Sequence, residues 1–229
     1  MERCYDAVIV GAGPNGLAAA VVLAEAGQSV LILEATETIG GGCRTRELTL
    51  PGYAHDVCAA IHPMAIVSPI LRKWPLKDYG LEWVQSPAAL AHPFDDGTAA
   101  VLYRSLAATG ATLEGDAEAW TSLMRPYLKH ADAFFDDVLR AVRIPRHPLL
   151  MARFASAGLR SCHSVVNKRF KGRNARALFA GCAAHSFLAL DAAASALPPS
   201  WTPASSKALS RSFTAKASFP IRPPNWPIS

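Results

Sequence analysis

The chain has 229 residues, of which 51% are hydrophobic and 18% charged, so it can form one large domain or two small ones and is not disordered overall. Its five cysteines are odd in number and never spaced as CxxC, which argues against a disulfide framework or a zinc site and favours a reducing cytoplasm. Residues 1–150 carry 12 basic and 17 acidic side chains, whereas residues 151–229 carry 11 basic and one acidic. The C-terminal excess predicts a solvated basic face, with contact to an anionic membrane surface as an alternative.

A glycine signature follows the first apolar run. Residues 7–10 predict a buried parallel strand, and a helix is expected from about Asn15 to Ala26, ended by Gly27. Between them, Gly11 permits a tight turn, Gly13 lets the backbone approach a pyrophosphate, and Gly16 allows the helix to pack closely on the strand. The positive end of the helix then points at the phosphates.

A second strand is predicted over residues 29–33 and returns parallel to the first through a right-handed crossover. Glu34 follows it, 23 residues after Gly11, where a carboxylate can accept hydrogen bonds from both ribose hydroxyls and repel a 2′-phosphate. Residues 7–24 lack charge, but Pro14, Asn15 and three glycines make them a poor membrane span. Nearby acidic residues also argue against a signal peptide.

A second glycine signature, Gly40-Gly41-Gly42-Cys43-Arg44-Thr45, begins six residues after Glu34. With Leu33-Glu34-Ala35, it resembles the glycine-doublet motif of the FAD-dependent amine oxidase and phytoene desaturase superfamily. The run Leu50-Pro51-Gly52-Tyr53-Ala54-His55-Asp56-Val57 resembles the phytoene dehydrogenase-like branch. The resemblance implies that the paired glycines and the arginine lie against the diphosphate and ribityl portion of FAD. The predicted cofactor-binding residues are Gly11, Gly13, Pro14, Asn15, Gly16, Glu34, Ala35, Gly40, Gly41, Gly42, Arg44 and Thr45.

The rest of the chain predicts a hairpin and helices. Asp95-Asp96-Gly97 separates two short strand-like runs. Asp116 is a candidate N-cap for a long helix from Ala117 to about Val142, with further helices near residues 148–161 and 174–188. We therefore expect an α/β fold in three parts: a Rossmann-like FAD-binding βαβ unit (1–75), a mixed, mainly helical substrate or cap region (76–196) and an irregular tail rich in proline and serine (197–229).

The resemblance implies an FAD-dependent oxidoreductase that transfers hydride from an apolar, carotenoid-like substrate to the flavin. An amine oxidase, a noncatalytic binding protein with this fold and an inactive fragment are the alternatives. Members of the superfamily are longer and complete the flavin domain with a C-terminal portion missing here, so a truncated or frame-altered piece is one interpretation.

No metal site is expected. His55, His62 and His92 are available for acid–base chemistry, but none is assigned a catalytic role. Cys43 is interpreted as a small loop residue rather than a covalent flavin attachment. We expect no nucleic-acid partner and a cytoplasmic location, peripheral to the membrane if the basic face binds lipid.

Overall fold

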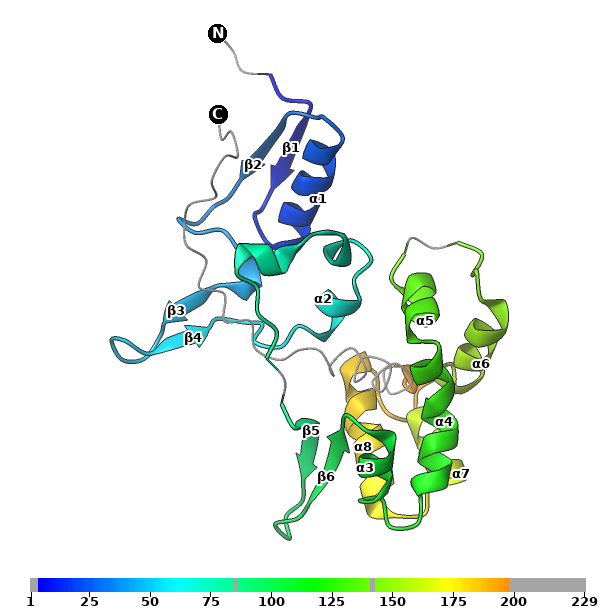
Figure 1. Ribbon diagram of the computed structural model, residues 1–229. Helices are drawn as coiled ribbons and strands as arrows, with labels where there is room; N and C mark the ends of the chain where they lie inside the picture. The colour runs from blue at the N-terminus through cyan, green and yellow to red at the C-terminus, as the bar shows by residue number, and fades with distance from the viewer. Residues whose placement is uncertain (1–3, 85, 141–142, 198–229) are drawn as a thin grey trace. The chain divides into compact units, whose positions relative to one another are not determined.

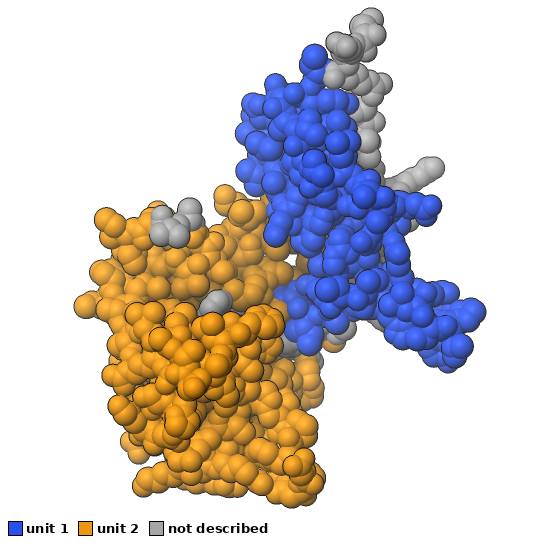
Figure 2. Space-filling view, turned by 180° about the vertical axis from the view of Figure 1, so that it is seen from behind, with its two compact units in different colours: residues 1–62 blue, residues 63–229 orange. Residues whose placement is uncertain are grey.

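A computed structural model describes residues 4–84, 86–140 and 143–197 (Figure 1). These residues form two compact units that divide between His62 and Pro63 (Figure 2). The three-part division predicted from the sequence stays a prediction, and its last part lies outside the described residues except for Leu197. No helix in the described ranges is both long enough and apolar enough to cross a membrane.

The first unit begins with the predicted βαβ element. Strands β1 (Ala7–Val10) and β2 (Val30–Leu33) pair in parallel, and helix α1 (Pro14–Glu25) connects them. Gly27, which has a φ of +82°, follows the helix in a left-handed conformation that glycine adopts readily. The predicted Rossmann-like α/β arrangement is therefore confirmed.

One face of this two-stranded sheet is less buried than its apolar sequence predicts. Ile9 faces α1, and its Cγ2 atom would lie 3.4 Å from a Cβ added at Gly16. On the opposite face, Val8 is 54% exposed and Val10 83% exposed. Side chains alternate between the faces of a strand, and α1 covers only one of them. The prediction of a fully buried strand was therefore wrong for these two residues.

A small antiparallel hairpin completes the first unit. The 3-10 turn η1 (Gly41–Cys43) leads into β3 (Thr45–Glu47), which pairs antiparallel with β4 (Ala54–Asp56). Thr45 lies opposite Asp56, and its hydroxyl donates to the Asp56 carboxylate at 2.9 Å. The hairpin thus continues directly from the second glycine signature.

The second unit combines the predicted hairpin with helices. Strands β5 (Ala88–Pro93) and β6 (Ala99–Tyr103) pair antiparallel, which confirms the hairpin. The helices are α2 (Pro63–Val67), α3 (Leu106–Gly110), α4 (Ala117–Lys129), α5 (Ala131–Val138), α6 (Pro148–Gly158), α7 (Cys162–Arg169) and α8 (Arg173–Ala183), with 3-10 turns η2 (Leu71–Lys73), η3 (Leu76–Tyr79) and η4 (Ala184–Ser186). The main core brings β6, α4, α7 and α8 together around Trp120, Phe170 and Phe179.

The predicted long helix is divided in two. Its apolar stripe is present, but α4 ends at Lys129 and α5 begins at Ala131, because His130 leaves the helical conformation (φ −116°, ψ 33°). Pro126 lies within α4 and has no amide hydrogen to donate, which weakens the helix near this point. The position of Val142 lies outside the described residues. Helix α7 was not predicted.

Asp116 precedes α4 as predicted, but its side chain does not cap that helix. Its carboxylate instead accepts the backbone amides of Lys171, at 3.0 and 2.9 Å, and Gly172, at 2.7 Å. Only 4% of the residue is exposed. Asp116 therefore holds the connection between α7 and α8 against the start of α4.

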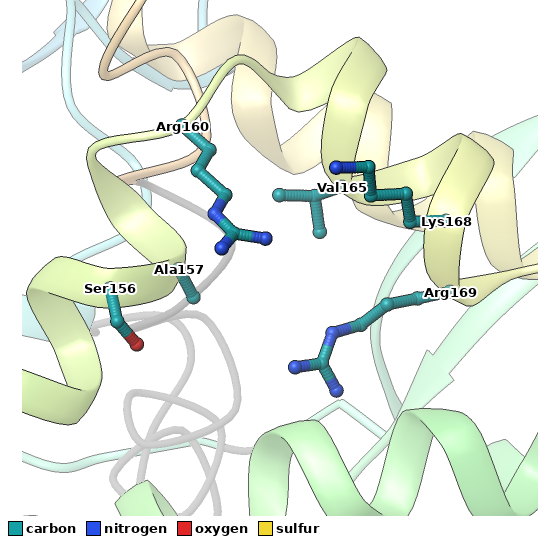
Figure 3. Close-up of a pocket in the computed structure, with 6 residues that line it drawn as sticks. All are labelled: Ser156, Ala157, Arg160, Val165, Lys168 and Arg169. Atoms are coloured by element: carbon teal, nitrogen blue, oxygen red, sulfur yellow. The ribbon is translucent and has the colours of Figure 1, made fainter.

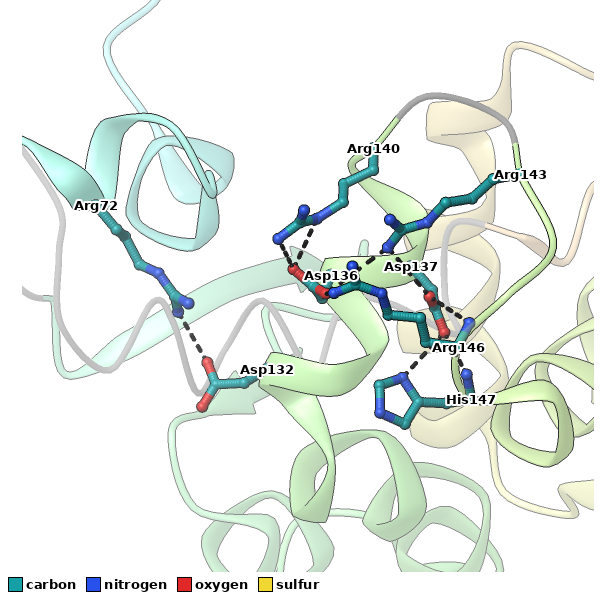
Figure 4. A network of polar contacts seen from close by, with 8 residues as sticks. All are labelled: Arg72, Asp132, Asp136, Asp137, Arg140, Arg143, Arg146 and His147. Atoms are coloured by element: carbon teal, nitrogen blue, oxygen red, sulfur yellow. Dashed lines mark hydrogen bonds and ion pairs between the residues drawn. The ribbon is translucent and has the colours of Figure 1, made fainter.

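A polar network braces the connection from α5 to α6 (Figure 4). The carboxylate of Asp137 accepts the backbone amides of Arg146 and His147, both at 2.9 Å, and contacts the His147 ring at 3.0 Å. Neighbouring Asp136 pairs with arginines of the same segment: Arg140, Arg143 and Arg146. Separately, Arg72 pairs with Asp132 at 2.8 Å, where both side chains are largely exposed.

Candidate dinucleotide-binding site

The two glycine signatures meet in the first unit. The Gly40 amide donates to the Ala12 carbonyl at 2.8 Å. A Cβ added at Gly41 would lie 2.9 Å from the Gly13 Cα atom, a backbone atom that cannot easily move away. The second loop therefore needs glycine at position 41 to approach the first, and the two loops meet beside the start of α1.

The start of α1 is suited to bind an anion. Gly13 is the N-cap residue and supplies no side-chain acceptor, and the first turn contains no acidic residue. The first amides of a helix have no partner within the helix, so here they remain available to phosphate oxygens. Gly16 packs so tightly that an added Cβ would lie 2.1 Å from the Gly11 carbonyl oxygen.

Glu34 lies between the two signatures and is oriented by three hydrogen bonds. Its Oε2 atom accepts the Ala12 amide at 2.8 Å, and its Oε1 atom accepts the amide and hydroxyl of Thr36 at 3.1 and 2.9 Å. These bonds, with the Ala12 amide first, lower the pKa of the Glu34 carboxyl. Because a carboxylate has about four acceptor positions, Glu34 retains capacity for a ribose hydroxyl.

Arg44 turns back onto its own loop. Its Nε atom donates to the Gly41 carbonyl at 2.8 Å, and its guanidinium also contacts the Thr36 hydroxyl. The side chain thereby stabilises the left-handed backbone at Gly40 and Gly41, which have φ values of +115° and +54°. The predicted contact of Arg44 with a diphosphate stays a prediction.

The remaining predicted residues occupy the same loops or their edges. Pro14 and Asn15 form the first turn of α1, where both are exposed. Gly42 lies within η1, Ala35 follows Glu34 and is exposed, and Thr45 opens β3. The binding role of each stays a prediction.

The polar partners of the predicted residues were not predicted from the sequence. Ala12 contributes its amide to Glu34 and its carbonyl to Gly40, so it joins the acid to both loops. Thr36 holds Glu34, contacts Arg44 and donates to the Thr38 carbonyl at 2.9 Å. A threonine two residues after the acid was the available signal, because short hydroxyl side chains bond readily to nearby groups.

The three candidate histidines are dispersed. His55 lies on β4 and contacts the Thr49 hydroxyl at 2.8 Å, and His62 contacts the Cys43 sulfur at 3.9 Å. His92 lies on β5 in the second unit, packed against Gly181. Its buried Nε2 atom has no hydrogen-bond partner among the described residues, and burial, together with nearby His185, lowers its pKa. The geometry therefore gives none of them a catalytic role.

The second unit contains a basic cavity of about 80 Å³ between α6 and α7 (Figure 3). Arg160, Lys168 and Arg169 line it, together with Ser156, Ala157 and Val165. These three cations form no ion pair with an acid in the described part of the chain. Arg173, another basic residue of the C-terminal excess, is engaged elsewhere: it pairs with Asp96 at 2.8 Å and lies 4.2 Å from the centre of the Phe94 ring.

Comparisons with known proteins agree with this geometry. Residues 9–73 match the family described as NAD(P)-binding Rossmann-like domain. A subunit of limonene dehydrogenase from Castellaniella defragrans is 30% identical over 143 residues, which cover 58% of this chain and 25% of that protein. An L-amino-acid oxidase of Echis ocellatus is 42% identical over 79 residues, or 34% of this chain and 15% of that protein.

The fold resembles that of putrescine oxidase bound to putrescine, with a TM-score of 0.53 and 22% identity. That match covers 92% of this chain but 44% of the oxidase chain. The chain thus spans about a quarter of the length of its first curated relatives and under half of this solved structure. Residues 9–73 thus match an NAD(P)-binding Rossmann-like domain, and the relatives are named as oxidoreductases. This confirms the predicted resemblance to FAD-dependent oxidoreductases, whereas the phytoene dehydrogenase-like branch stays a prediction.

Proposed function

We propose that the first unit binds FAD and that the chain is part of an FAD-dependent oxidoreductase. The observation that carries this proposal is the contact of Gly13 with Gly41, beside an acid that bonds to the Ala12 amide. One glycine loop with a ribose-binding acid suits any adenine dinucleotide. A second glycine loop packed on the first supports FAD, as the superfamily resemblance implies.

Each part of the site has a separate task in this proposal. Bound FAD would supply the redox chemistry by accepting hydride at its N5 atom, and the protein would supply binding and orientation. The amides at the start of α1 would hold the diphosphate, and Glu34 would accept a ribose hydroxyl. Arg44 would keep the second loop in its left-handed form through the Gly41 carbonyl.

We propose an apolar, carotenoid-like hydrocarbon as the substrate, which would undergo dehydrogenation. The relative named as part of a limonene dehydrogenase supports this class, because limonene is a hydrocarbon. The relatives named putrescine oxidase and L-amino-acid oxidase support amine oxidation equally well. Anaerobic bleaching of the flavin by a polyene, but not by putrescine or an L-amino acid, would favour the hydrocarbon.

Cofactor content is the direct test of the proposed function. The purified chain should show flavin absorbance and release FAD on denaturation, or it should bind added FAD in preference to NAD. A chain that stays colourless and cannot be reconstituted would overturn the enzyme proposal for this polypeptide. FAD bound without bleaching by either substrate class would indicate a noncatalytic protein or an inactive piece.

The basic cavity supports a peripheral contact with anionic lipid as a further part of the proposal. Arg160, Lys168 and Arg169 converge there without an acidic partner among the described residues, and residues 192–229 contain no acid that could neutralise them. Co-sedimentation with vesicles of phosphatidylglycerol, but not of phosphatidylcholine, checks this contact. Binding to both vesicles or to neither would contradict it.

A further inference from the structure

Two cysteines oppose each other at the base of the β3–β4 hairpin. Thr45 is paired with Asp56, and two hydrogen bonds extend the ladder toward the glycine loop. The Val57 amide donates to the Arg44 carbonyl at 2.9 Å, and the Ala59 amide donates to the Gly42 carbonyl at 2.9 Å. Cys43 and Cys58 lie between these two bonds, one on each segment.

This position favours a covalent link. In a regular antiparallel ladder, opposed residues between two such hydrogen bonds have Cα atoms about 4.5 Å apart, and disulfides span roughly 4.4–6.8 Å. Cys43 itself is the last residue of the 3-10 turn η1, so the backbone is not a regular strand on that side. Cys58 also lies directly against the glycine loop, because a Cβ added at Gly42 would be 3.5 Å from its Cβ and 3.7 Å from its sulfur. Both cysteines are exposed free thiols, so a small oxidant can reach them.

The pair is placed where a link would affect the second glycine loop. Cys43 is the last residue of η1 and immediately precedes Arg44, which bonds to the Gly41 carbonyl. We propose that Cys43 and Cys58 form a reversible cross-strand disulfide, with hydrogen peroxide as the oxidant, that fixes this loop to the hairpin. This inference does not depend on which dinucleotide the site binds.

The reaction balances with one peroxide molecule. One cysteine thiolate attacks a peroxide oxygen and becomes a sulfenic acid, and the hydroxide that leaves takes up a proton to form water. The second sulfur then attacks the sulfenic sulfur, the S–S bond forms, and the oxygen leaves as a second water with the thiol proton. The two thiols together lose two electrons and two protons, and peroxide is reduced to two waters.

His62 is the neighbouring group that can take up a thiol proton, because its Nδ1 atom lies 3.9 Å from the Cys43 sulfur. Although Cys43 is exposed, partial burial of its sulfur, followed by the Asp56 carboxylate and Cys58, raises the pKa of the Cys43 thiol. Cys43 is therefore largely a thiol at neutral pH, and its oxidation should become faster as the pH rises. The proposed disulfide therefore forms on oxidation and breaks on reduction, and it is not a permanent structural bond.

Peroxide treatment of the reduced full-length chain tests the proposal. The intact mass should fall by two hydrogen atoms and return with dithiothreitol. Trypsin should release residues 4–44 joined to residues 47–72 under non-reducing conditions. Because residues 4–44 also contain Cys4, the mapping uses a Cys4→Ser chain, in which the cross-link should persist.

Cys43→Ser and Cys58→Ser, each in the Cys4→Ser chain, should both abolish the cross-link. A cross-link that survives either substitution, or wild-type oxidation that yields only sulfinic acid at these positions, would overturn the proposal. Circular dichroism of the serine variants shows whether they fold, and the mapping of the Cys4→Ser chain decides the question even if they do not. None of these measurements involves flavin, so failure here is separate from failure of the proposed FAD site.

Discussion

Glu34 is the acid that connects the expected ribose position to the first glycine loop. Its carboxylate holds the Ala12 amide and Thr36, so its substitution should change both the loop and the ribose contact. Glu34→Gln keeps an acceptor but removes the charge, and we expect FAD affinity to fall roughly ten- to hundredfold. Fluorescence titration with FAD measures this. Glu37→Gln on the same exposed loop is the matched control, and an equal loss there would contradict the assigned role.

The pH dependence of the same contact has a definite sign. Hydrogen bonds lower the pKa of Glu34 in the folded chain, so its stabilising contribution is complete above the unfolded value of about 4.3 and is lost as the pH falls through the folded value. FAD affinity should therefore not decline through protonation of Glu34 between neutral pH and about pH 5. A Glu34-dependent decline in that interval, absent from Glu34→Gln, would show that the carboxylate is not held as described.

At the scale of elements, the contact between the glycine loops can be tested by a single methyl group. Gly41→Ala places a Cβ 2.9 Å from the Gly13 Cα atom and should separate the loops. Gly52→Ala is the matched control, because Gly52 also has a positive φ (+83°) but nothing within 4 Å of an added Cβ. Both substitutions carry roughly 1–2 kcal/mol of backbone strain, yet only Gly41→Ala should weaken FAD binding, by about tenfold or more in a titration. Equal affinities would show that the loop contact does not matter for binding.

Asp116 provides the corresponding test in the second unit. Asp116→Ala leaves the amides of Lys171 and Gly172 without their acceptor, and we expect the free energy of unfolding to fall by about 2 kcal/mol. Asp132→Ala removes only an exposed ion pair with Arg72 and should cost at most about 1 kcal/mol. Urea unfolding followed by tryptophan fluorescence compares the two, since Trp120 is buried in this core. A smaller loss for Asp116→Ala would contradict its bracing role.

Local sequence signals predicted most of the helices and strands. The features that differ from the prediction depend on contacts between residues far apart in the sequence. The βαβ unit follows from short-range features, an apolar run and glycines at fixed spacing. These features placed Gly11 after β1, Gly16 in α1 and Glu34 after β2, as the structure has them, and the binding roles stay predictions. The role of Asp116 was not predictable, because its amide partners lie 55 and 56 residues away. The exposure of Val10 was not predictable either, because an apolar run does not indicate whether one or both faces of a sheet are covered.

For the whole molecule, the division into two units predicts two independent responses to FAD. Each unit has its own packed elements, and the proposed cofactor site lies entirely in the first. Ligand binding stabilises the part that folds around it, by about 2.7 kcal/mol at a hundredfold excess over Kd. All five tryptophans lie beyond residue 62, so tryptophan fluorescence does not report directly on the first unit.

We therefore expect saturating FAD to leave the tryptophan-detected unfolding midpoint unchanged while it slows amide hydrogen exchange in residues 4–62. Asp116→Ala should do the reverse: it should lower the tryptophan-detected midpoint and leave exchange in the first unit as it was. Urea unfolding followed by tryptophan fluorescence measures the midpoint, and mass spectrometry of peptides from residues 4–62 measures the hydrogen exchange. If FAD raises the tryptophan-detected midpoint as well, the units unfold as one cooperative body, because stabilising the first would then also stabilise the second.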